Sequence, residues 1–434
     1  MYDLDLTGNW AGILSLIIFV LAYVLVIFEE VTHMRKSKPV MVAAGLIWAL
    51  IGIAYAMAGQ SEVANELAVE IIAEYGELFL FLLVAITYVN TLEERRTFDV
   101  LRGRMIGLGI GYRQLFLLTG VLAFFLAGVL DNLTTALVMG AVAMALGRDN
   151  PRFVVLTCIS VVVAANAGGA FSPFGNITTL MVWQQGKLEV FEFFALFVPS
   201  VINWVIPAAL MFAAVPNEKP AKVTETVKGK PGMIGVAVLF ALTIVTAVSF
   251  KNFLYLPPAL GMMLGLGYLQ VYSYYLKMTG TRRGDHDMVL DAFREVQKVE
   301  WDTLLFFFGI IFAVGGLGVL GYLAFASELL YVDLGATWAN VIIGVLSAVV
   351  DNIPVMFAVL AMDPAMSDGQ WLLITLTTGT GGSMLSIGSA AGVALMGLAR
   401  GVYTFSAHLK WTWAIALGYA ASIWAHLAIN AAWF

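Results

Sequence analysis

Long apolar runs separated by short polar loops make up almost the whole chain, which is the pattern of a protein whose helices cross a membrane. About 20 consecutive apolar residues are enough for a helix to span the hydrocarbon of a bilayer. Runs at or near that length predict spanning helices at 10–28, 39–58, 77–92, 152–184, 191–214, 232–249, 255–276, 303–322, 371–398 and 409–430.

Two further apolar runs, 113–147 and 325–361, are each interrupted near the middle by an Asp-Asn pair. Each arm has about 15 apolar residues, which is short of the roughly 20 that a span needs. A re-entrant hairpin, which enters and leaves the bilayer on one side, therefore fits each run better than a span does. Its irregular tip must be buried in protein or face water, because lipid does not tolerate unpaired backbone groups.

The composition narrows the class further. The chain of 434 residues is 61% hydrophobic and only 12% charged, whereas about 25% of the residues in a soluble protein are charged. We therefore predict an all-α polytopic membrane protein with no room for a soluble domain. Its expected surroundings are the lipid bilayer, and no nucleic-acid partner is expected. The single cysteine, Cys158, excludes an intramolecular disulfide.

Basic residues gather in alternate loops, and short loops rich in Lys and Arg stay in the cytoplasm. They follow the first, third, fifth and seventh predicted spans: Arg35, Lys36, Lys38, Arg95, Arg96, Arg102, Arg104, Lys219, Lys222, Lys228, Lys230, Lys277, Arg282 and Arg283. All these loops lie on one side if the N-terminus is outside. The first hairpin then opens to the cytoplasm and the second to the outside.

This topology predicts an inverted repeat. The two Asp-Asn pairs differ by 351 − 131 = 220 positions, and three glycines after the first pair recur after the second at a constant offset of 213. We expect a first repeat at 1–214, a cytoplasmic linker at 215–231 and a second repeat at 232–434. Each repeat contains spans, one hairpin (113–147 or 325–361) and one broken helix (152–184 or 371–398). Inverted repeats with broken helices place the substrate site near the bilayer midplane.

A carboxylate deep in an apolar run is costly, and it usually marks an ion or proton path. Asp131 and Asp351 fit this description. In a medium of low dielectric constant each needs a cation or a proton to neutralise it. Because sodium and a proton compete for one carboxylate, binding one expels the other, which is an exchange mechanism. The alternative is that each aspartate only caps the following helix, since Asp is a favoured N-cap; capping and ion binding can coexist.

Glycine and proline interrupt the helices 152–184 and 371–398, and the freed carbonyls of such breaks coordinate sodium or protons in transporters. Neutral side-chain oxygens near both breaks and both hairpin tips complete the predicted cation and proton site: Asp131, Asn132, Thr134, Thr135, Asn176, Thr178, Thr179, Asp351, Asn352, Thr378, Ser386 and Ser389. Asp131, Asn176 and Asp351 are the expected sodium ligands. The alternative explanation of the glycines is close helix packing by small residues.

Three weaker features have simpler explanations. The segment 61–76, with acidic residues at four-residue spacing, predicts an interfacial helix. The segment 287–299 predicts a second one, with Val289, Phe293 and Val296 on its apolar face. His426, in the last predicted span, is expected to be a core histidine that is hydrogen-bonded to a neighbour.

The residues at the two tips and the first break resemble those of the NhaD-type sodium/proton antiporters of the ion transporter superfamily. The similar segments are Leu-Asp-Asn-Leu-Thr-Thr-Ala at 130–136, Ser-Pro-Phe-Gly-Asn-Ile-Thr-Thr at 172–179, Val-Asp-Asn-Ile-Pro at 350–354, and the stretches 77–99 and 36–50. The resemblance implies a homodimer with a scaffold part and a mobile transport part that moves like an elevator. It also implies sodium, and lithium as a second candidate, as substrates in a bacterial inner membrane, with no cofactor.

Two alternatives to antiport remain. The nearer one is a sodium-coupled dicarboxylate symporter or an anion exporter of the same superfamily. Dicarboxylate transporters of that superfamily, however, carry Ser-Asn-Thr at the tips, where this chain has Asp-Asn. Two carboxylates at those places would repel an anion. The second break departs from the first, with Ser389 in place of Asn176. An intramembrane enzyme would need a motif such as two histidines four residues apart, and the sequence has none, so no enzyme activity is expected.

Overall fold

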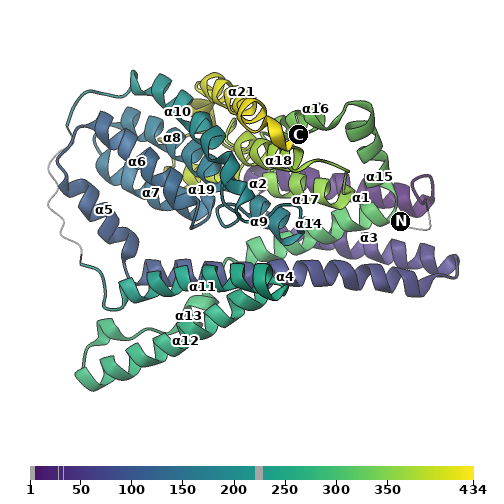
Figure 1. Ribbon diagram of the computed structural model, residues 1–434, viewed down its shortest axis with the longest axis horizontal. Helices are drawn as coiled ribbons and strands as arrows, with labels where there is room; N and C mark the ends of the chain where they lie inside the picture. The colour runs from purple at the N-terminus through teal and green to yellow at the C-terminus, as the bar shows by residue number, and fades with distance from the viewer. Residues whose placement is uncertain (1–4, 28, 33, 220–227) are drawn as a thin grey trace. The chain divides into compact units, whose positions relative to one another are not determined.

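The computed structural model describes residues 5–27, 29–32, 34–219 and 228–434. Within this part of the chain the regular structure is helical, without a β-strand. It forms two compact units, each drawn from several stretches of the chain (Figure 1). Unit 1 comprises Met1–Thr91, Ile234–Leu334 and Phe357–Pro364, and unit 2 comprises Leu92–Met233, Gly335–Met356 and Ala365–Phe434. Lys222 and the rest of 220–227, within the predicted linker, lie outside the described residues.

Unit 1 is built from long helices. It contains α1 (Trp10–Ile27), α2 (Glu29–Thr32), α3 (Ser37–Met57), most of α4 (Ser61–Glu94), nearly all of α11 (Met233–Leu254), α12 (Pro258–Arg283), η2 (His286–Met288), α13 (Ala292–Gln297), α14 (Trp301–Val319), α15 (Tyr322–Ser327) and the π-helix η3 (Glu328–Asp333). Buried Tyr88 joins three of them. Its hydroxyl donates to the Gly265 carbonyl of α12 at 2.7 Å and accepts from the Thr243 hydroxyl of α11 at 2.9 Å.

Unit 2 contains the broken helices and the first hairpin. Its elements are α5 (Thr97–Gly107), α6 (Tyr112–Ala127), α7 (Asn132–Leu146), α8 (Pro151–Ala170), α9 (Ile177–Gln184), η1 (Glu192–Leu196), α10 (Phe197–Phe212), α16 (Ala336–Leu346), α18 (Asp368–Gly381), α19 (Ala390–Leu398), α20 (Phe405–Leu409), α21 (Thr412–Ile429) and η4 (Ala431–Trp433); α17 (Asn352–Met362) is divided between the units. Helix α8 is central, because α6, α7, α10 and α18 pack against it. In the most apolar stretch of α8, 94% of the residues are buried.

Six helices among the described residues are long and apolar enough to cross a membrane: α3, α8, η1 with α10, α11, α14 and α21. Five shorter apolar helices accompany them: α1, α6, α7, α16 and α17. In the most apolar stretch of α11, only 22% of the residues are buried. Most of its apolar side chains are therefore placed to contact lipid rather than protein. An apolar surface of this kind identifies a multi-pass helical membrane protein.

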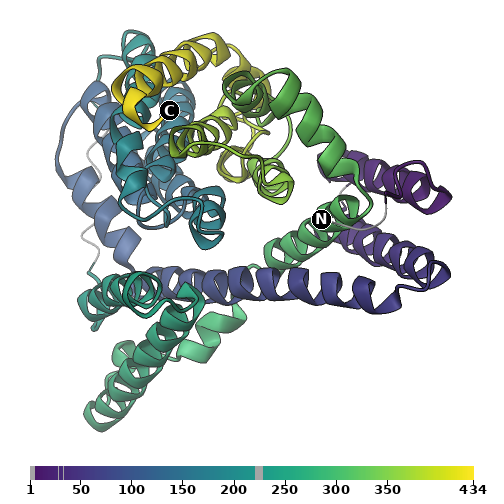
Figure 2. The same cartoon turned by 45° about the vertical axis from the view of Figure 1, so that its right-hand side comes forward.

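The long helix α4 corrects the first of the interfacial predictions. Figure 2 shows α4 as one uninterrupted helix, and its 34 residues join the segment 61–76 to the predicted span 77–92. The prediction of a separate helix was wrong because nothing between the two segments breaks the backbone ladder. Gly76 at their junction costs only about 1 kcal/mol in a helix interior.

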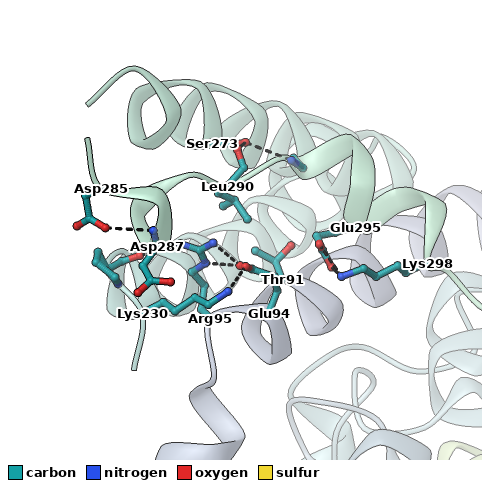
Figure 3. Close-up of polar contacts among 12 residues, drawn as sticks. Thr91, Glu94, Arg95, Lys230, Ser273, Asp285, Asp287, Leu290, Glu295 and Lys298 are labelled. Atoms are coloured by element: carbon teal, nitrogen blue, oxygen red, sulfur yellow. Dashed lines mark hydrogen bonds and ion pairs between the residues drawn. The ribbon is translucent and has the colours of Figure 1, made fainter. Parts of the chain in front are cut away.

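The second interfacial prediction was also wrong in detail. The short helices η2 and α13 replace one continuous helix, and Asp285 and Asp291 each accept a hydrogen bond that caps one of them. Phe293 is 65% exposed, whereas Glu295 is 2% exposed and pairs with Lys298 (Figure 3). The buried apolar side chains of this segment are instead Leu290, Ala292 and Val299.

The second interrupted run, 325–361, does not begin with a single long helix. Helices α16 and α17, of 11 residues each, flank its Asp-Asn pair, and α16 begins at Ala336 rather than at 325. Gly335 causes the difference, because its φ of +81° separates α16 from the π-helix η3 and such a conformation ends a helix. The first interrupted run contains α6 and α7, of 16 and 15 residues, which pack against each other.

A buried ion cluster lies within unit 2 at the end of α4. The Glu94 carboxylate pairs with Arg95 and, at 2.7 Å, with the Lys230 ammonium (Figure 3). Arg95 is fully buried and donates to the Pro231 carbonyl at 3.1 Å. Although burial alone would raise it, the pKa of Glu94 is held below its usual range by hydrogen bonds from Arg95 and Lys230. The cluster therefore attaches the chain before α11 to the chain after α4.

Candidate ion-binding site

The first hairpin tip presents Asp131 at the start of α7. Its Oδ1 accepts a hydrogen bond from the Thr134 N–H at 2.8 Å, and its Oδ2 accepts one from the Thr134 hydroxyl at 2.7 Å. The backbone φ of Asp131 is +34°, a conformation that costs about 1–3 kcal/mol for a residue other than glycine and that clusters at functional sites. Asp131 therefore caps α7. Its carboxylate oxygens are acceptors only, which is the type of group that a cation binds.

The second tip repeats the backbone of the first. The Leu126 carbonyl accepts from the N–H groups of residues 129 and 130, and the Leu346 carbonyl accepts from those of residues 349 and 350, all at 2.8–3.0 Å. The offset is 346 − 126 = 220, the same that separates the two aspartates. Asp351 thus stands directly before α17, as Asp131 stands before α7. Both aspartates are half-buried, and Asn132 and Asn352, which follow them, are buried.

The two helix breaks also repeat each other. A Cβ on Gly169 would lie 2.6 Å from the Gly175 carbonyl oxygen, and a Cβ on Gly382 would lie 2.6 Å from the Gly388 carbonyl oxygen. Any larger residue would force the two sides of each break apart. The glycines therefore do allow close packing, as the alternative explanation held. This close packing brings the two sides of each break together, so that the carbonyls of Gly175 and Gly388 lie within the breaks.

Asn176 organises the first break. It caps α9 through an Oδ1 that accepts from the Thr178 N–H at 3.4 Å, while the Thr179 hydroxyl donates to the Asn176 carbonyl at 2.6 Å. All three residues are buried. Among the described residues, neither the Thr178 hydroxyl nor the Asn176 Nδ2 has a hydrogen-bond partner. Buried groups of this kind need a partner, so the break carries unused polar capacity.

The second break is organised by Ser389, which caps α19 and accepts from the Gly392 N–H at 3.3 Å. The Ser386 hydroxyl is buried without a partner among the described residues, and the same holds for Thr135 on α7. Thr378 differs, because its hydroxyl donates to the Ile374 carbonyl of its own helix at 2.7 Å. The hydroxyl hydrogen of Thr378 is therefore already used within its own helix.

A chain of three side chains joins the first tip to the second break. The Asn132 Nδ2 donates to the Asn166 Oδ1 at 2.8 Å, and the Asn166 Nδ2 donates to the Ser389 hydroxyl at 3.0 Å. Asn166 lies in α8 and is fully buried. Sequence reasoning did not count it among the site residues, although a carboxamide in an otherwise apolar helix was the available signal. Helix packing agrees with this link, because α19 packs against α7.

His408 is a second residue that sequence reasoning missed. It is fully buried, and its Nε2 donates to the Ser383 carbonyl of the second break at 2.9 Å, while its Nδ1 is hydrogen-bonded to the Tyr403 hydroxyl at 2.6 Å. These two bonds fix the ring against the break and hold the freed carbonyl in place. His426 matches its prediction, because it bonds to the Gly369 carbonyl and to Asn430.

Each tip supplies one carboxylate, Asp131 or Asp351, and the two breaks supply neutral oxygens. No cluster of three His, Cys, Asp or Glu side chains occurs in the described part of the chain. A set of carboxylate, carbonyl, hydroxyl and amide oxygens suits a hard cation. The broken helices bring these groups together, since α18 packs against both α8 and α9.

Comparison with known proteins gives consistent matches. The family model for citrate transporters matches residues 23–379. The Na(+)/H(+) antiporter NhaD of Alkalimonas amylolytica is 55% identical, over 99% of this chain and 92% of its own length. The protein of the same name from Vibrio parahaemolyticus is 57% identical over 89% of this chain and 98% of its own length. Sodium/proton antiporter 1 of Arabidopsis thaliana is 33% identical over 95% of this chain and 72% of its own length.

Proposed function

Since the chain belongs to the NhaD family of Na+/H+ antiporters, we propose that Asp131 and Asp351 are the groups through which it exchanges sodium for protons. The protein is a secondary transporter rather than an enzyme, and sodium is its substrate rather than a cofactor. The observation that carries the assignment is the repeated tip. Two aspartates precede the helices α7 and α17 with the same backbone hydrogen bonds, in a chain with few other charges.

Competition at these carboxylates supplies the coupling. A half-buried carboxylate surrounded by apolar helices is stabilised by either a proton or a cation. Sodium bound by Asp131, Asn176 and the carbonyls of the first break would lower the affinity of the carboxylate for a proton. Protonation would in turn weaken the hold on sodium. The reciprocal effect of the two ligands is required by linkage, and it makes each ion drive the other.

The match to the citrate-transporter family model raises the alternative of an anionic substrate. Two carboxylates at the tips oppose it, because a dicarboxylate would bring like charges together in a medium of low dielectric constant. The relatives that match over nearly the whole chain carry the name of sodium/proton antiporters. Antiport is therefore favoured over a sodium-coupled symporter or an anion exporter.

The fine topology is part of the proposal. The offset of 220 at the tips and of 213 at the breaks supports two repeats, 1–214 and 232–434, each with a re-entrant hairpin. The basic loops favour opposite topologies for the two repeats, with the N-terminus outside and the protein in the bacterial inner membrane. The alternate placement of the Arg and Lys residues named above supports this orientation.

We assign unit 2 to transport and unit 1 to the scaffold of a homodimer. Both aspartates and both breaks belong to unit 2. Unit 1 carries exposed apolar side chains on α11 and α12, among them Ile234 and Val271, each 72% exposed. A dimer would cover part of such a surface. In an elevator mechanism unit 2 would move as a body and carry the bound ion.

Exchange in everted membrane vesicles tests the function. A respiratory proton gradient is established and followed with a pH-sensitive dye, and salts are then added with no organic anion present. Sodium should collapse the gradient, lithium should do so as the second substrate, and potassium should not. Asp131→Asn should abolish the response, while Asp149→Asn, in an exposed turn, should retain it. Collapse that requires citrate would overturn antiport in favour of the symporter.

A further inference from the structure

The bridge from Asn132 through Asn166 to Ser389 has a counterpart whose middle residue is missing. Applying the repeat offsets to its members gives 132 + 220 = 352, 166 + 213 = 379 and 389 − 213 = 176. The equivalent residues are Asn352 at the second tip, Gly379 in α18 and Asn176 at the first break. Asn352 and Asn176 carry polar side chains, as Asn132 and Ser389 do. Gly379, however, has no side chain that could join them in the way that Asn166 joins Asn132 to Ser389.

The two remaining amides lack the partners that their counterparts have. Asn352 and Asn176 are 2% and 3% exposed, and the Nδ2 of each is without an acceptor among the described residues. The bond from the Thr178 N–H to the Asn176 Oδ1 determines which end of that amide is the donor. Buried donors rarely remain unsatisfied in a folded protein. An acceptor that is not one of the described residues would satisfy both amides.

The space at Gly379 faces one of these donors. A Cβ on Gly379 would lie 3.8 Å from the Asn176 Nδ2 and 3.7 Å from the Ala170 Cβ, which is ordinary contact distance. An oxygen that accepts from the Nδ2 lies about 2.9 Å from it. The position therefore has room for one small group between α18 and the first break.

We propose that a single bound water occupies this position and accepts hydrogen bonds from Asn176 and Asn352. A water suits the site because it needs two to four polar partners and supplies the acceptor that both amides lack. It would join the second tip to the first break, as Asn166 joins the first tip to the second break. One crossing is thus made by a side chain and the other by an exchangeable molecule.

This difference has a consequence for transport, which rests on the proposed function. Asn176 is an expected sodium ligand, so the water holds the first break in its binding geometry. Loss of the water would leave two buried donors unpaired and would weaken sodium binding. The water site itself does not depend on the ion that is carried, so the site and the function can be tested separately.

Three variants test the site. Gly379→Ala puts a methyl group where the water oxygen lies, and Gly379→Ser replaces the water with a hydroxyl that can accept. The control is Gly267→Ala in α12, a helical glycine whose Cβ would meet nothing within 4 Å. Thermal unfolding of the purified full-length protein without sodium gives the first readout. The apparent KM for sodium in the vesicle assay gives the second.

Gly379→Ala should lower the Tm by about 3 °C or more relative to Gly267→Ala and should raise the KM for sodium about tenfold. Gly379→Ser should lie close to the wild type in both. The proposal is overturned if Gly379→Ala is as stable as the control, because no water was then displaced. It is equally overturned if serine is as harmful as alanine, because space rather than an acceptor is then the cause. Absence of sodium exchange in the wild type would refute the function and leave the Tm comparison standing.

Discussion

Replacing Asn166 by alanine removes the middle of the bridge between the first tip and the second break. Two hydrogen bonds are lost, of 2.8 Å to Asn132 and 3.0 Å to Ser389. Each contributes about 0.5–1.5 kcal/mol, and the buried amide of Asn132 that is left without its acceptor costs about 1–3 kcal/mol more. Ser389 keeps its bond from the Gly392 N–H. We therefore expect Asn166→Ala to destabilise the protein by about 2–6 kcal/mol.

Denaturant or thermal unfolding of the purified protein measures this loss, and Asn203→Ala is the matched control. Asn203 is also a fully buried asparagine in a helix, but its amide makes a single long bond of 3.4 Å to the Ser422 hydroxyl. Its replacement should cost about 1 kcal/mol or less. A double-mutant cycle of Asn166→Ala with Ser389→Ala isolates the second bond, with an expected coupling of about 1 kcal/mol.

The same variant should weaken sodium binding, because the bridge holds the residue next to Asp131. A rise in the KM for sodium with little change in the maximum rate is the expected pattern. The reasoning is refuted if Asn166→Ala costs no more stability than Asn203→Ala, or if the coupling to Ser389 is zero. Either result would mean that the bridge does not hold the tip against the break.

The remaining predictions concern the carboxylates, the first break and the ion cluster. Asp131→Asn should abolish exchange in a folded protein with an unchanged Tm, and Asp351→Asn should reduce or abolish it; full activity of either variant in vesicles would remove that aspartate from the site. Thr179→Ala should raise the KM for sodium more than it lowers the maximum rate, because its hydroxyl orients the first break through the Asn176 carbonyl; an unchanged sodium dependence would exclude it. Burial alone would raise the pKa of Glu94, but hydrogen bonds hold it below its usual 4.5. The ionised Glu94 therefore adds its full contribution to the free energy of unfolding at neutral pH. This contribution is lost as the pH falls below 4.5 through the lowered pKa. Glu94→Gln should accordingly lower the Tm at pH 7, and the difference from the wild type should shrink on acidification; a constant difference would contradict this.

The helices and both breaks could be predicted from sequence because apolar length and glycine act locally. Gly335 shows where this failed, because its positive φ separates α16 from the helix before it without interrupting the apolar pattern. Helix α4 shows the opposite error, since a change from acidic to apolar composition did not end the helix. Both errors concern backbone continuity, which composition does not determine.

The candidate site could be predicted only in part. Asp131 and Asp351 were evident because a charge in an apolar run is costly. Asn166 was not, because its meaning comes from Ser389, which lies 223 residues away in sequence. His408 was missed for the same reason, since its partner Ser383 belongs to another element. Sequence shows which residues are unusual, while their pairing depends on how distant helices pack.

Proton release on sodium binding tests the central claim most directly. Sodium is added to the purified protein in weakly buffered solution near neutral pH, and the liberated protons are counted with a pH indicator. Competition at the aspartates predicts that protons appear as sodium binds, and that Asp131→Asn releases fewer protons and binds sodium more weakly. Sodium that binds tightly without releasing protons, or that binds Asp131→Asn as well as the wild type, would contradict the account.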